Sequence, residues 1–353
     1  MTSKAGDSRK GVAKWCLVTA LMASWAGSCQ AAPLLCAWDL LGKGGEVHTL
    51  AQDYATAMAR EGVHFQVRTF TDERVVAEDF RAGQCAAAIL TGFRARPFNQ
   101  VTGSLDSLGS AVVVRDGQVD LAASYDVLRK LIQVFASPQA ASLMTEGQHE
   151  VGGILPVGAA YPMLRERFEI TPRSLAGKRV AAFDHDRVQA MLIQKMGAQA
   201  ISSDVTNVGA KFNNGLVDLI HMPAITFKPF ELAKGMGAKG GVLRMPVMIP
   251  TLQLVFNRSQ VPASLGAVSR VYWAGLHEGA MKSIQRAEAQ VPARLWFDLP
   301  PEHVQPYVDV LREGRIAGAN AGLYSWRTLN LMKKARCQAS PAMAECSVPT
   351  ESP

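Results

Sequence analysis

Residues 212–223 read FNNGLVDLIHMP, and this layout indicates the class of fold. A glycine follows an apparent helix, a short apolar strand comes next, and Pro223 stops the strand because proline has no N–H to donate. Residues 80–92, FRAGQCAAAILTG, repeat the same layout. Two copies in one chain predict two similar lobes.

Strands and helices alternate around each copy of this layout. Further apolar runs that predict strands lie at residues 34–41, 63–70, 178–184 and 198–202. Helical spacing of apolar residues is found at 45–61, 72–82, 186–196 and 204–214. Such alternation predicts an α/β fold in which each lobe is a βαβαβ-based, mainly parallel sheet with right-handed crossovers.

From residue 264 onward the pattern is helical, with helices predicted at residues 264–290, 301–315 and about 323–336. Trp273, Trp296 and Trp326 lie in this region, and we interpret them as packing anchors. The expected organisation begins with a leader (residues 1–31), lobe one (32–152) and lobe two (153–250). A returning strand with helices that pack mainly on lobe one (251–336) and a disulfide-closed tail (337–353) follow.

The first 31 residues have the pattern of a secretory signal peptide. Four lysines and arginines are followed by an apolar run at residues 15–26 and by small residues around Ala31. The run is shorter than the roughly 20 residues of a membrane span, so we expect cleavage near Ala31 and a periplasmic protein. A lipid anchor at Cys29 is the alternative, and it is disfavoured because the preceding WAGS lacks the leucine of a lipobox.

Composition and charge are those of a globular protein of about two domains. The 353 residues are 48% hydrophobic and 19% charged. The formal charge of +7 falls to +4 (7 minus 3) without the leader, which carries four Lys and Arg against Asp7. The other basic residues are dispersed along the chain, so no nucleic-acid partner is predicted.

Four cysteines follow the predicted leader, and an even number in an exported protein predicts two disulfides with three possible connectivities. Cys337 and Cys346 close a short loop in the tail, whereas Cys36 and Cys85 each begin a predicted strand. We therefore expect these two pairs. A four-cysteine metal site is the alternative, but the close CxxC spacing of zinc sites is missing.

No motif in the sequence specifies catalysis, a cofactor or a metal. HExxH and GxSxG are absent, and DHD at residues 184–186 is interpreted as a helix cap after a strand. GMGAKG at 235–240 follows a helix, which reverses the dinucleotide-binding arrangement. GKGGEV at 42–47 lies between strand and helix, but it has Val47 at the third glycine position. We predict neither a cofactor nor a metal.

Four segments in order resemble the solute-binding receptors of tripartite ATP-independent periplasmic (TRAP) transporters. They read FTDERVVAEDFRAGQCAAAILTG, TPRSLAGKRVAAFD, GAKFNNGLVDLIHMP and LQLVFNRSQVP. The similarity runs from about residue 35 to 346, and its specificity lies in the order and spacing. It implies a type II-like, two-lobe periplasmic-binding-protein fold that closes on a small organic solute, often a carboxylate, and delivers it to subunits of a membrane transporter.

One position departs from this family. The receptors carry an arginine that clamps the carboxylate late in the strand after "LkGlkiR", and Ala181 stands at that position here, with Arg179 two residues earlier. A carboxylate buried without a cationic partner is costly. We therefore expect Arg94 and Arg96, just past the end of a strand in TGFRARPF, to replace the clamp.

In open α/β sheets, ligands bind at the carboxyl ends of the strands. The residues expected to face the ligand from lobe one are Asp39, Thr71, Asp72, Thr91, Arg94 and Arg96. From lobe two they are Phe183, Asp184, Asn207, Asn213, Asn214, His221 and Met222. The alternative for the polar residues is local capping, and for Phe183 and Met222 a place in the core.

Two other functions use the same scaffold. A periplasmic enzyme would need a base with a shifted pKa in the cleft, and His221, Asp184 and Asp72 are the candidates. An envelope module for sensing or interaction would use closure to engage a membrane partner. We predict a solute-binding protein and no catalytic residue.

Overall fold

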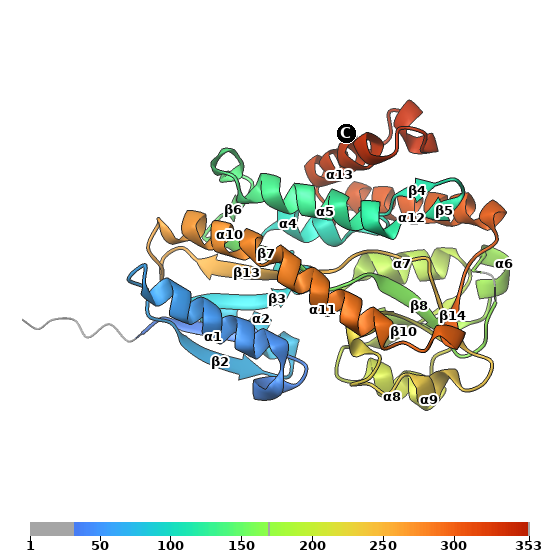
Figure 1. The fold of residues 1–353 in the computed structure, drawn as a ribbon, viewed down its shortest axis with the longest axis horizontal. Coiled ribbons are helices and arrows are strands. Elements are labelled where there is room, and N and C mark those ends of the chain that lie inside the picture. The colour runs from blue at the N-terminus through green and yellow to red at the C-terminus, as the bar shows by residue number, and fades with distance from the viewer. Residues whose placement is uncertain (1–31, 169, 352–353) are drawn as a thin grey trace, which may run out of the picture. The chain divides into compact units, whose positions relative to one another are not determined.

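The computed structural model of the protein describes residues 32–168 and 170–351 (Figure 1). The predicted signal peptide and Cys29 lie outside the described residues. Residues from 32 onward form one unit built around two six-stranded sheets. The predicted two-lobe α/β class is confirmed, and each sheet is mixed rather than wholly parallel.

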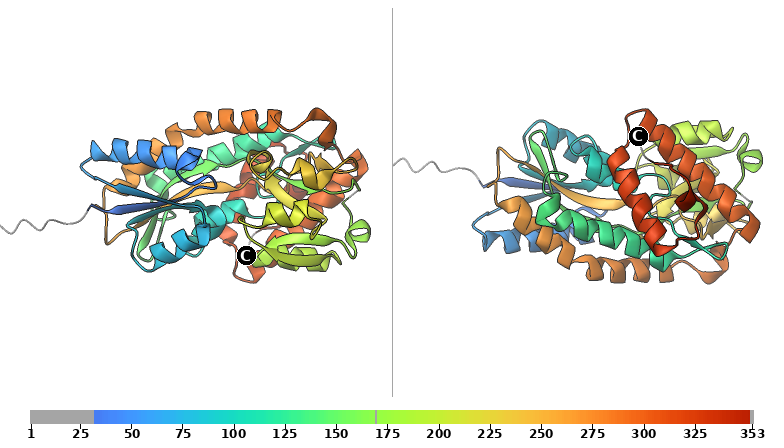
Figure 2. Two further views of the ribbon diagram at one scale, coloured as in Figure 1. Left: turned by 90° about the horizontal axis from the view of Figure 1, so that it is seen from below. Right: turned by 90° about the horizontal axis from the view of Figure 1, so that it is seen from above.

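The sheet of lobe one has the order β2-β1-β3-β13-β7-β6. Its strands are, in that order, Gln66–Phe70, Leu34–Trp38, Ala87–Thr91, Thr251–Asn257, His149–Pro156 and Thr145–Glu146. β1 pairs in parallel with β2 and β3, and β13 is antiparallel to β3 and β7. The crossover helices α1 (Glu46–Ala59) and α2 (Glu73–Arg81) cover opposite faces of the sheet (Figure 2).

The sheet of lobe two has the order β10-β9-β11-β8-β12-β14. Its strands are, in that order, Gln199–Ser203, Arg179–Phe183, Leu219–Pro223, Ala160–Leu164, Gly241–Leu243 and Trp296–Phe297. β9 is parallel to β10 and β11, and β8 is antiparallel to β11 and β12. The crossover helices are α7 (Arg187–Lys195) and α8 (Val208–Asn213).

Local chemistry explains the two repeated stretches. Helix α2 begins where Asp72 accepts a hydrogen bond from the Arg74 N–H, and the chain turns at Gly83 with φ of 74°. The stretch from residue 212 behaves alike: α8 ends, Gly215 takes φ of 72°, and β11 runs to Pro223. Left-handed φ at both glycines strongly favours a residue without a side chain.

The chain crosses between the lobes twice. β7 belongs to the sheet of lobe one up to Pro156, so lobe two begins later than the expected residue 153. The chain returns just before β13, and an antiparallel bridge between Ala160 and Met248 joins the two crossings. Within β7, side chains at Gly152 and Gly153 would collide with Phe256 and Trp273, because an added Cβ would lie 2.1 Å from either ring.

The C-terminal helices serve both lobes. They are α10 (Leu265–Gly275), α11 (His277–Ala289), α12 (Pro301–Asn320) and α13 (Trp326–Ala339). The helix predicted at 264–290 is thus two helices that meet at Leu276. α10 packs on β7 and carries the buried Trp273, whereas α12 packs on α7 of lobe two. The helices therefore contact lobe two as well as lobe one. α13 lies against α5 (Leu121–Ala136).

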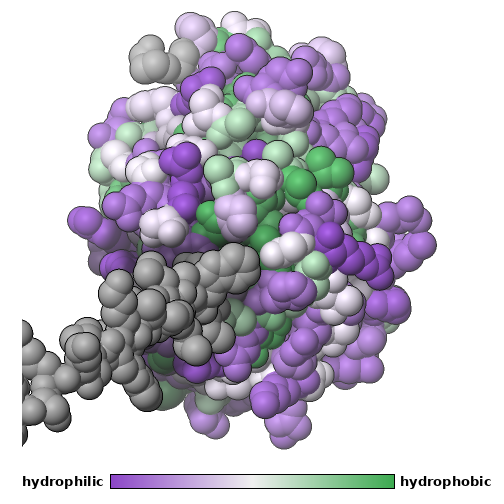
Figure 3. All heavy atoms as spheres, turned by 90° about the vertical axis from the view of Figure 1, so that its left-hand side faces the viewer, coloured by the Kyte–Doolittle hydropathy of each residue, from purple (hydrophilic) through white to green (hydrophobic). Residues whose placement is uncertain are grey.

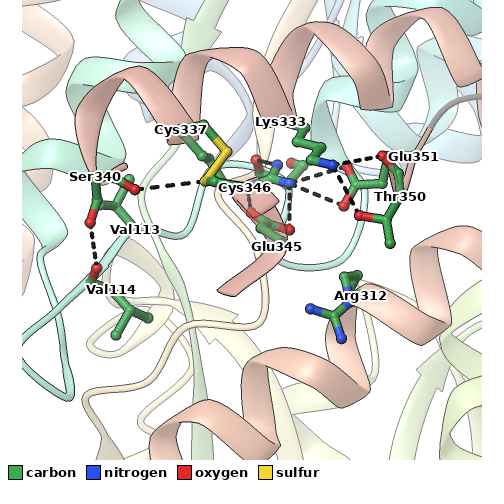
Figure 4. A network of polar contacts seen from close by, with 12 residues as sticks. Val113, Val114, Arg312, Lys333, Cys337, Ser340, Glu345, Cys346, Thr350 and Glu351 are labelled. Carbon is green, nitrogen blue, oxygen red and sulfur yellow. Dashed lines mark hydrogen bonds and ion pairs between the residues drawn. A yellow bond between two sulfur atoms is a disulfide. The ribbon is translucent and has the colours of Figure 1, made fainter. Parts of the chain in front are cut away.

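Both predicted disulfides are confirmed. Cys36–Cys85 joins β1 to the segment before β3, and Cys337–Cys346 joins the last turns of α13 to the tail. The tail is anchored by charge as well, because Arg336 of α13 contacts Glu345 and Glu351 in a buried cluster (Figure 4).

The outer surface at the lobe-one end is largely hydrophilic, with hydrophobic groups between the polar ones (Figure 3). Among the described residues, none of the helices is both long and apolar enough to span a membrane.

Candidate ligand-binding site

A cavity of about 660 Å³ lies where the two lobes face each other. Its walls come from the segment after β1, from α1, from both crossings, from the end of β11 and from α11. This volume is in the range of pockets that hold small organic ligands.

Most of the wall is apolar. The apolar residues from lobe one and the crossings include Leu41, Val47, Leu50, Leu155, Val157, Met248 and Leu252. Those from lobe two and α11 include Met222, Ile225, Ile284 and Ala287. A ligand that fills the cavity must therefore have an apolar body, since polar groups against these walls would lose their hydrogen bonds to water.

Five of the thirteen predicted ligand-facing residues line this cavity, namely Asp39, Thr91, Phe183, His221 and Met222. Asp39 is buried, and its two oxygens accept hydrogen bonds from the Leu41 N–H at 2.8 Å and the His48 N–H at 2.9 Å. It therefore fixes the loop that leads into α1, and this loop forms part of the wall.

His221 lies on β11 beside Gln189 of α7. Its Nδ1 is 3.5 Å from the Gln189 amide nitrogen, and the amide oxygen of Gln189 accepts from the Phe183 N–H at 2.9 Å. Burial lowers the pKa of His221 to about 4, so the ring is neutral at neutral pH. Gln189 thus connects two of the predicted residues through one side chain.

Arg94 and Arg96 lie beside the cavity but are not among the residues that line it. One Arg94 nitrogen is 3.2 Å from Asp184 of lobe two. Arg96 donates from Nε to the Gly103 carbonyl at 3.1 Å, and its guanidinium lies 4.7 Å from the centre of the Tyr324 ring. Three buried donors of this segment have no hydrogen-bond partner: Thr91 Oγ1, Arg94 Nε and Arg96 Nη2.

The contact of Arg94 with Asp184 is one of several between the lobes. His185, next to Asp184, stacks on Phe183 with ring centres 5.6 Å apart. It also meets Phe93 of lobe one edge to face, with ring centres 5.9 Å apart. Burial acts to raise the pKa of Asp184, but His185 and Arg94 outweigh it and lower that pKa. Asp184 is therefore ionised at neutral pH and can hold Arg94 across the cleft.

The remaining predicted residues do not line the cavity, and most have local roles. Asp72 caps α2. Asn213 donates to the Phe230 carbonyl at 2.8 Å and accepts from the Gly235 N–H at 3.1 Å. Asn207 accepts from the Asp204 N–H at 3.1 Å, Asn214 follows the end of α8, and the Thr71 carbonyl accepts from Trp38 at 3.3 Å.

Arg179 is engaged elsewhere. It lies at the first residue of β9, at the opposite end from Phe183, and its guanidinium binds both oxygens of Asp218 at 2.6 and 3.1 Å. Ala181, at the position of the family's clamp, is buried in the sheet. Neither residue lines the cavity.

Sequence reasoning missed several residues of the wall. Glu73 is buried, accepts a hydrogen bond from the Thr91 N–H and has its pKa raised by burial to about 7. It directly follows Thr71 and Asp72 at the end of a strand, a position that could have signalled it. The wall formed by α11 had no such signal. Among the residues that the structure describes, no three His, Cys, Asp or Glu side chains are grouped to hold a metal ion.

Comparison with known proteins gives a family and a fold. The model of a family described as "Solute-binding protein AdeT 1/2" matches residues 46–351. The "Probable solute-binding protein AdeT1" of Acinetobacter baumannii is 36% identical over 314 residues, which are 89% of this chain and 100% of that protein.

Solved TRAP periplasmic solute-binding proteins share the fold. One from Haemophilus influenzae with bound L-gulonate has a TM-score of 0.66 at 12% identity, over 87% of this chain and 99% of its own. One from Desulfovibrio salexigens with bound orotic acid has a TM-score of 0.64 at 13% identity, over 87% and 99%.

Proposed function

We propose, since this chain belongs to the AdeT 1/2 family of solute-binding proteins, that it captures a small organic anion between its two lobes. The membership and the shared fold confirm the predicted resemblance to TRAP-type receptors. Binding, not turnover, is the activity of such a protein. The ligand is held without covalent chemistry and released unchanged.

The unpartnered donors beside the cavity carry this proposal. Thr91 Oγ1, Arg94 Nε and Arg96 Nη2 are all buried, and all three lie within residues 91–96, which begin at the last residue of β3. Buried donors without partners are unfavourable, and a carboxylate supplies several acceptor sites at once. An anion placed here would meet two guanidinium groups and one hydroxyl. The bound L-gulonate and orotic acid of the structural neighbours are organic acids, which supports this ligand class.

The rest of the ligand would lie in the cavity. Its apolar wall suits a carbon skeleton or ring with few hydroxyls, and the volume of about 660 Å³ accommodates one small molecule. We therefore propose an organic acid with an apolar body. The acid would sit beside Arg94, and the body against Leu252, Met248 and Ile284.

Closure of the two lobes would follow from this geometry. Arg94 and Thr91 belong to lobe one, whereas Phe183, His221 and Met222 belong to lobe two. A ligand that contacts both sets binds the closed state more tightly than the open one, and so it stabilises closure. Asp184 holds Arg94 in this structure, and we propose that the anion takes over part of that role.

Location and partner complete the proposal. The predicted leader, cleaved near Ala31, would export the chain to the periplasm, and the closed form would deliver its solute to subunits of a membrane transporter. The enzyme alternative has less support. His221, with its pKa near 4, is a weak base, Asp184 is paired with Arg94, and Asp72 caps a helix.

A thermal-shift screen of the mature chain tests the function. The set should contain gulonate, orotate, aromatic and aliphatic monocarboxylates, and neutral and cationic analogues. An organic acid should raise the melting temperature, because ligand at 100 times its dissociation constant stabilises the folded state by about 2.7 kcal/mol. Mass spectrometry should recover it unchanged. Turnover abolished by His221→Ala would instead establish the enzyme, and stabilisation by cations alone would refute an anionic ligand.

A further inference from the structure

We propose that the protein has a second ligand site, for a small organic cation with an apolar body, in a separate cavity of about 560 Å³. The two cavities share none of their lining residues but lie on the same elements. Ala160 of β8 lines the first cavity and Tyr161 the second, because neighbouring residues of a strand point to opposite faces. Similarly, Ala287 of α11 lines the first and Glu288 the second.

Glu288 supplies the negative charge. Its Oε1 accepts hydrogen bonds from the Tyr161 hydroxyl at 2.8 Å and the Tyr125 hydroxyl at 3.5 Å. Tyr125 is held in turn by the Ala159 N–H at 2.7 Å. Burial raises the pKa of both tyrosines, so both are neutral, and among the described residues no ion pair is found for Glu288. The carboxylate is therefore oriented by neutral donors while its charge stays uncompensated.

The other charges of this cavity compensate each other. Arg244 lies 2.9 Å from Asp298, and its guanidinium lies 5.4 Å from the centre of the Trp296 ring. This pair adds no net charge, so the cavity carries one net negative charge from Glu288. Burial raises the pKa of Glu288 even though the two tyrosines donate to it, as expected of a carboxylate without a cation.

Aromatic and aliphatic side chains define the rest of the ligand. Tyr161 and Trp296 meet edge to face, with ring centres 4.9 Å apart. Rings of this kind attract organic ammonium groups, and Trp296 already attracts Arg244. Leu121, Met245 and Val304 form the apolar side of the cavity. The combination of one carboxylate, two rings and an aliphatic wall fits an aryl- or alkyl-ammonium ion and disfavours an anion.

Isothermal titration of the mature chain with benzyltrimethylammonium chloride tests this site. We expect saturable one-to-one binding that Glu288→Gln weakens at least about tenfold, because glutamine keeps the shape and loses the charge. Arg244→Gln should strengthen binding by removing a competing cation. A variant that fails to fold would lose binding, so stronger binding by Arg244→Gln would show a direct effect on a ligand site. Glu302→Gln, exposed at the start of α12, is the control and should bind the probe normally.

Three outcomes would overturn the proposal. The first is that the wild-type chain shows no saturable binding up to about 10 mM probe, because a small cation held by both a charge and a ring should bind more tightly than that. The second is binding that Glu288→Gln leaves unchanged, and the third concerns the first cavity. Leu252→Trp, which fills the first cavity, should leave probe binding intact. Loss of binding there would assign the probe to the first cavity, so this test is independent of the proposed anion.

Discussion

Arg315 of α12 donates two hydrogen bonds to one carboxylate oxygen of Glu351, from Nε at 2.8 Å and from Nη2 at 2.5 Å, and both side chains are buried. Arg336 of α13 reaches the same carboxylate at 3.1 Å and Glu345 at 2.6 Å. Two arginines and two glutamates thus neutralise each other inside the protein. The tail packs against α12 and α13 because it supplies both carboxylates of this cluster (Figure 4).

We predict that Glu351→Gln lowers the free energy of unfolding by about 3 to 5 kcal/mol, because it leaves a buried guanidinium without its counter-charge. Urea unfolding of the two proteins measures the difference. The matched control is Glu313→Gln, which removes the exposed pair with Lys195 and should cost at most about 1 kcal/mol. Equal losses in both variants would mean that the buried cluster does not anchor the tail.

The two disulfides should differ in their contributions. The loop between Cys36 and Cys85 spans 49 residues and that between Cys337 and Cys346 spans 9. Because each bond restricts the unfolded chain, the first should stabilise the folded state by about 4 kcal/mol and the second by about 2.5 kcal/mol. Double serine variants of each pair, compared by denaturant unfolding under oxidising conditions, test the order. A larger loss for the tail pair would show that the bond acts by holding Glu345 and Glu351 in place.

Glu73 predicts a dependence of stability on pH. Burial raises its pKa in the folded state from 4.5 to about 7, so its contribution is full below pH 4.5 and is lost as the pH rises through 7. Asp106, with a pKa raised by burial to about 7, acts in the same direction. Between pH 4.5 and pH 8, the free energy of unfolding of Glu73→Gln should therefore rise by about 3 kcal/mol relative to that of the wild type. The exposed Glu78→Gln on the same helix should follow the wild type; parallel curves for all three proteins would contradict the prediction.

Local patterns in the sequence sufficed for the parts of the fold that local chemistry decides. Apolar runs, helix-ending glycines and Pro223 predicted both βαβαβ units, and the cysteine count with strand positions predicted both disulfides. The break at Leu276 was not predicted, because the helical spacing of α10 continues into α11.

The site was harder to predict because the sequence does not show where a polar side chain finds its partner. Asn213, the last residue of α8, was expected to face the ligand, yet its amide is used within lobe two by Phe230 and Gly235. The buried ion pairs between the arginines of α12 and α13 and the glutamates of the tail gave no local signal for the same reason. Only the fold brings Arg336 and Glu351 together.

The anion, once identified by the thermal screen, should depend on Arg94 and Arg96 and not on Arg179. Loss of one partner of a buried, charge-assisted pair typically costs about 3 to 5 kcal/mol, so calorimetry on Arg94→Ala or Arg96→Ala should show binding at least about a hundredfold weaker. Asp184→Asn should strengthen binding, because it frees Arg94 from the carboxylate 3.2 Å away. Arg179→Ala should bind normally, since that guanidinium is held by Asp218. Normal affinity in the first two variants with a collapse in Arg179→Ala would identify Arg179 as the clamp. Normal affinity in all three would mean that the ligand's charge is not held by these arginines.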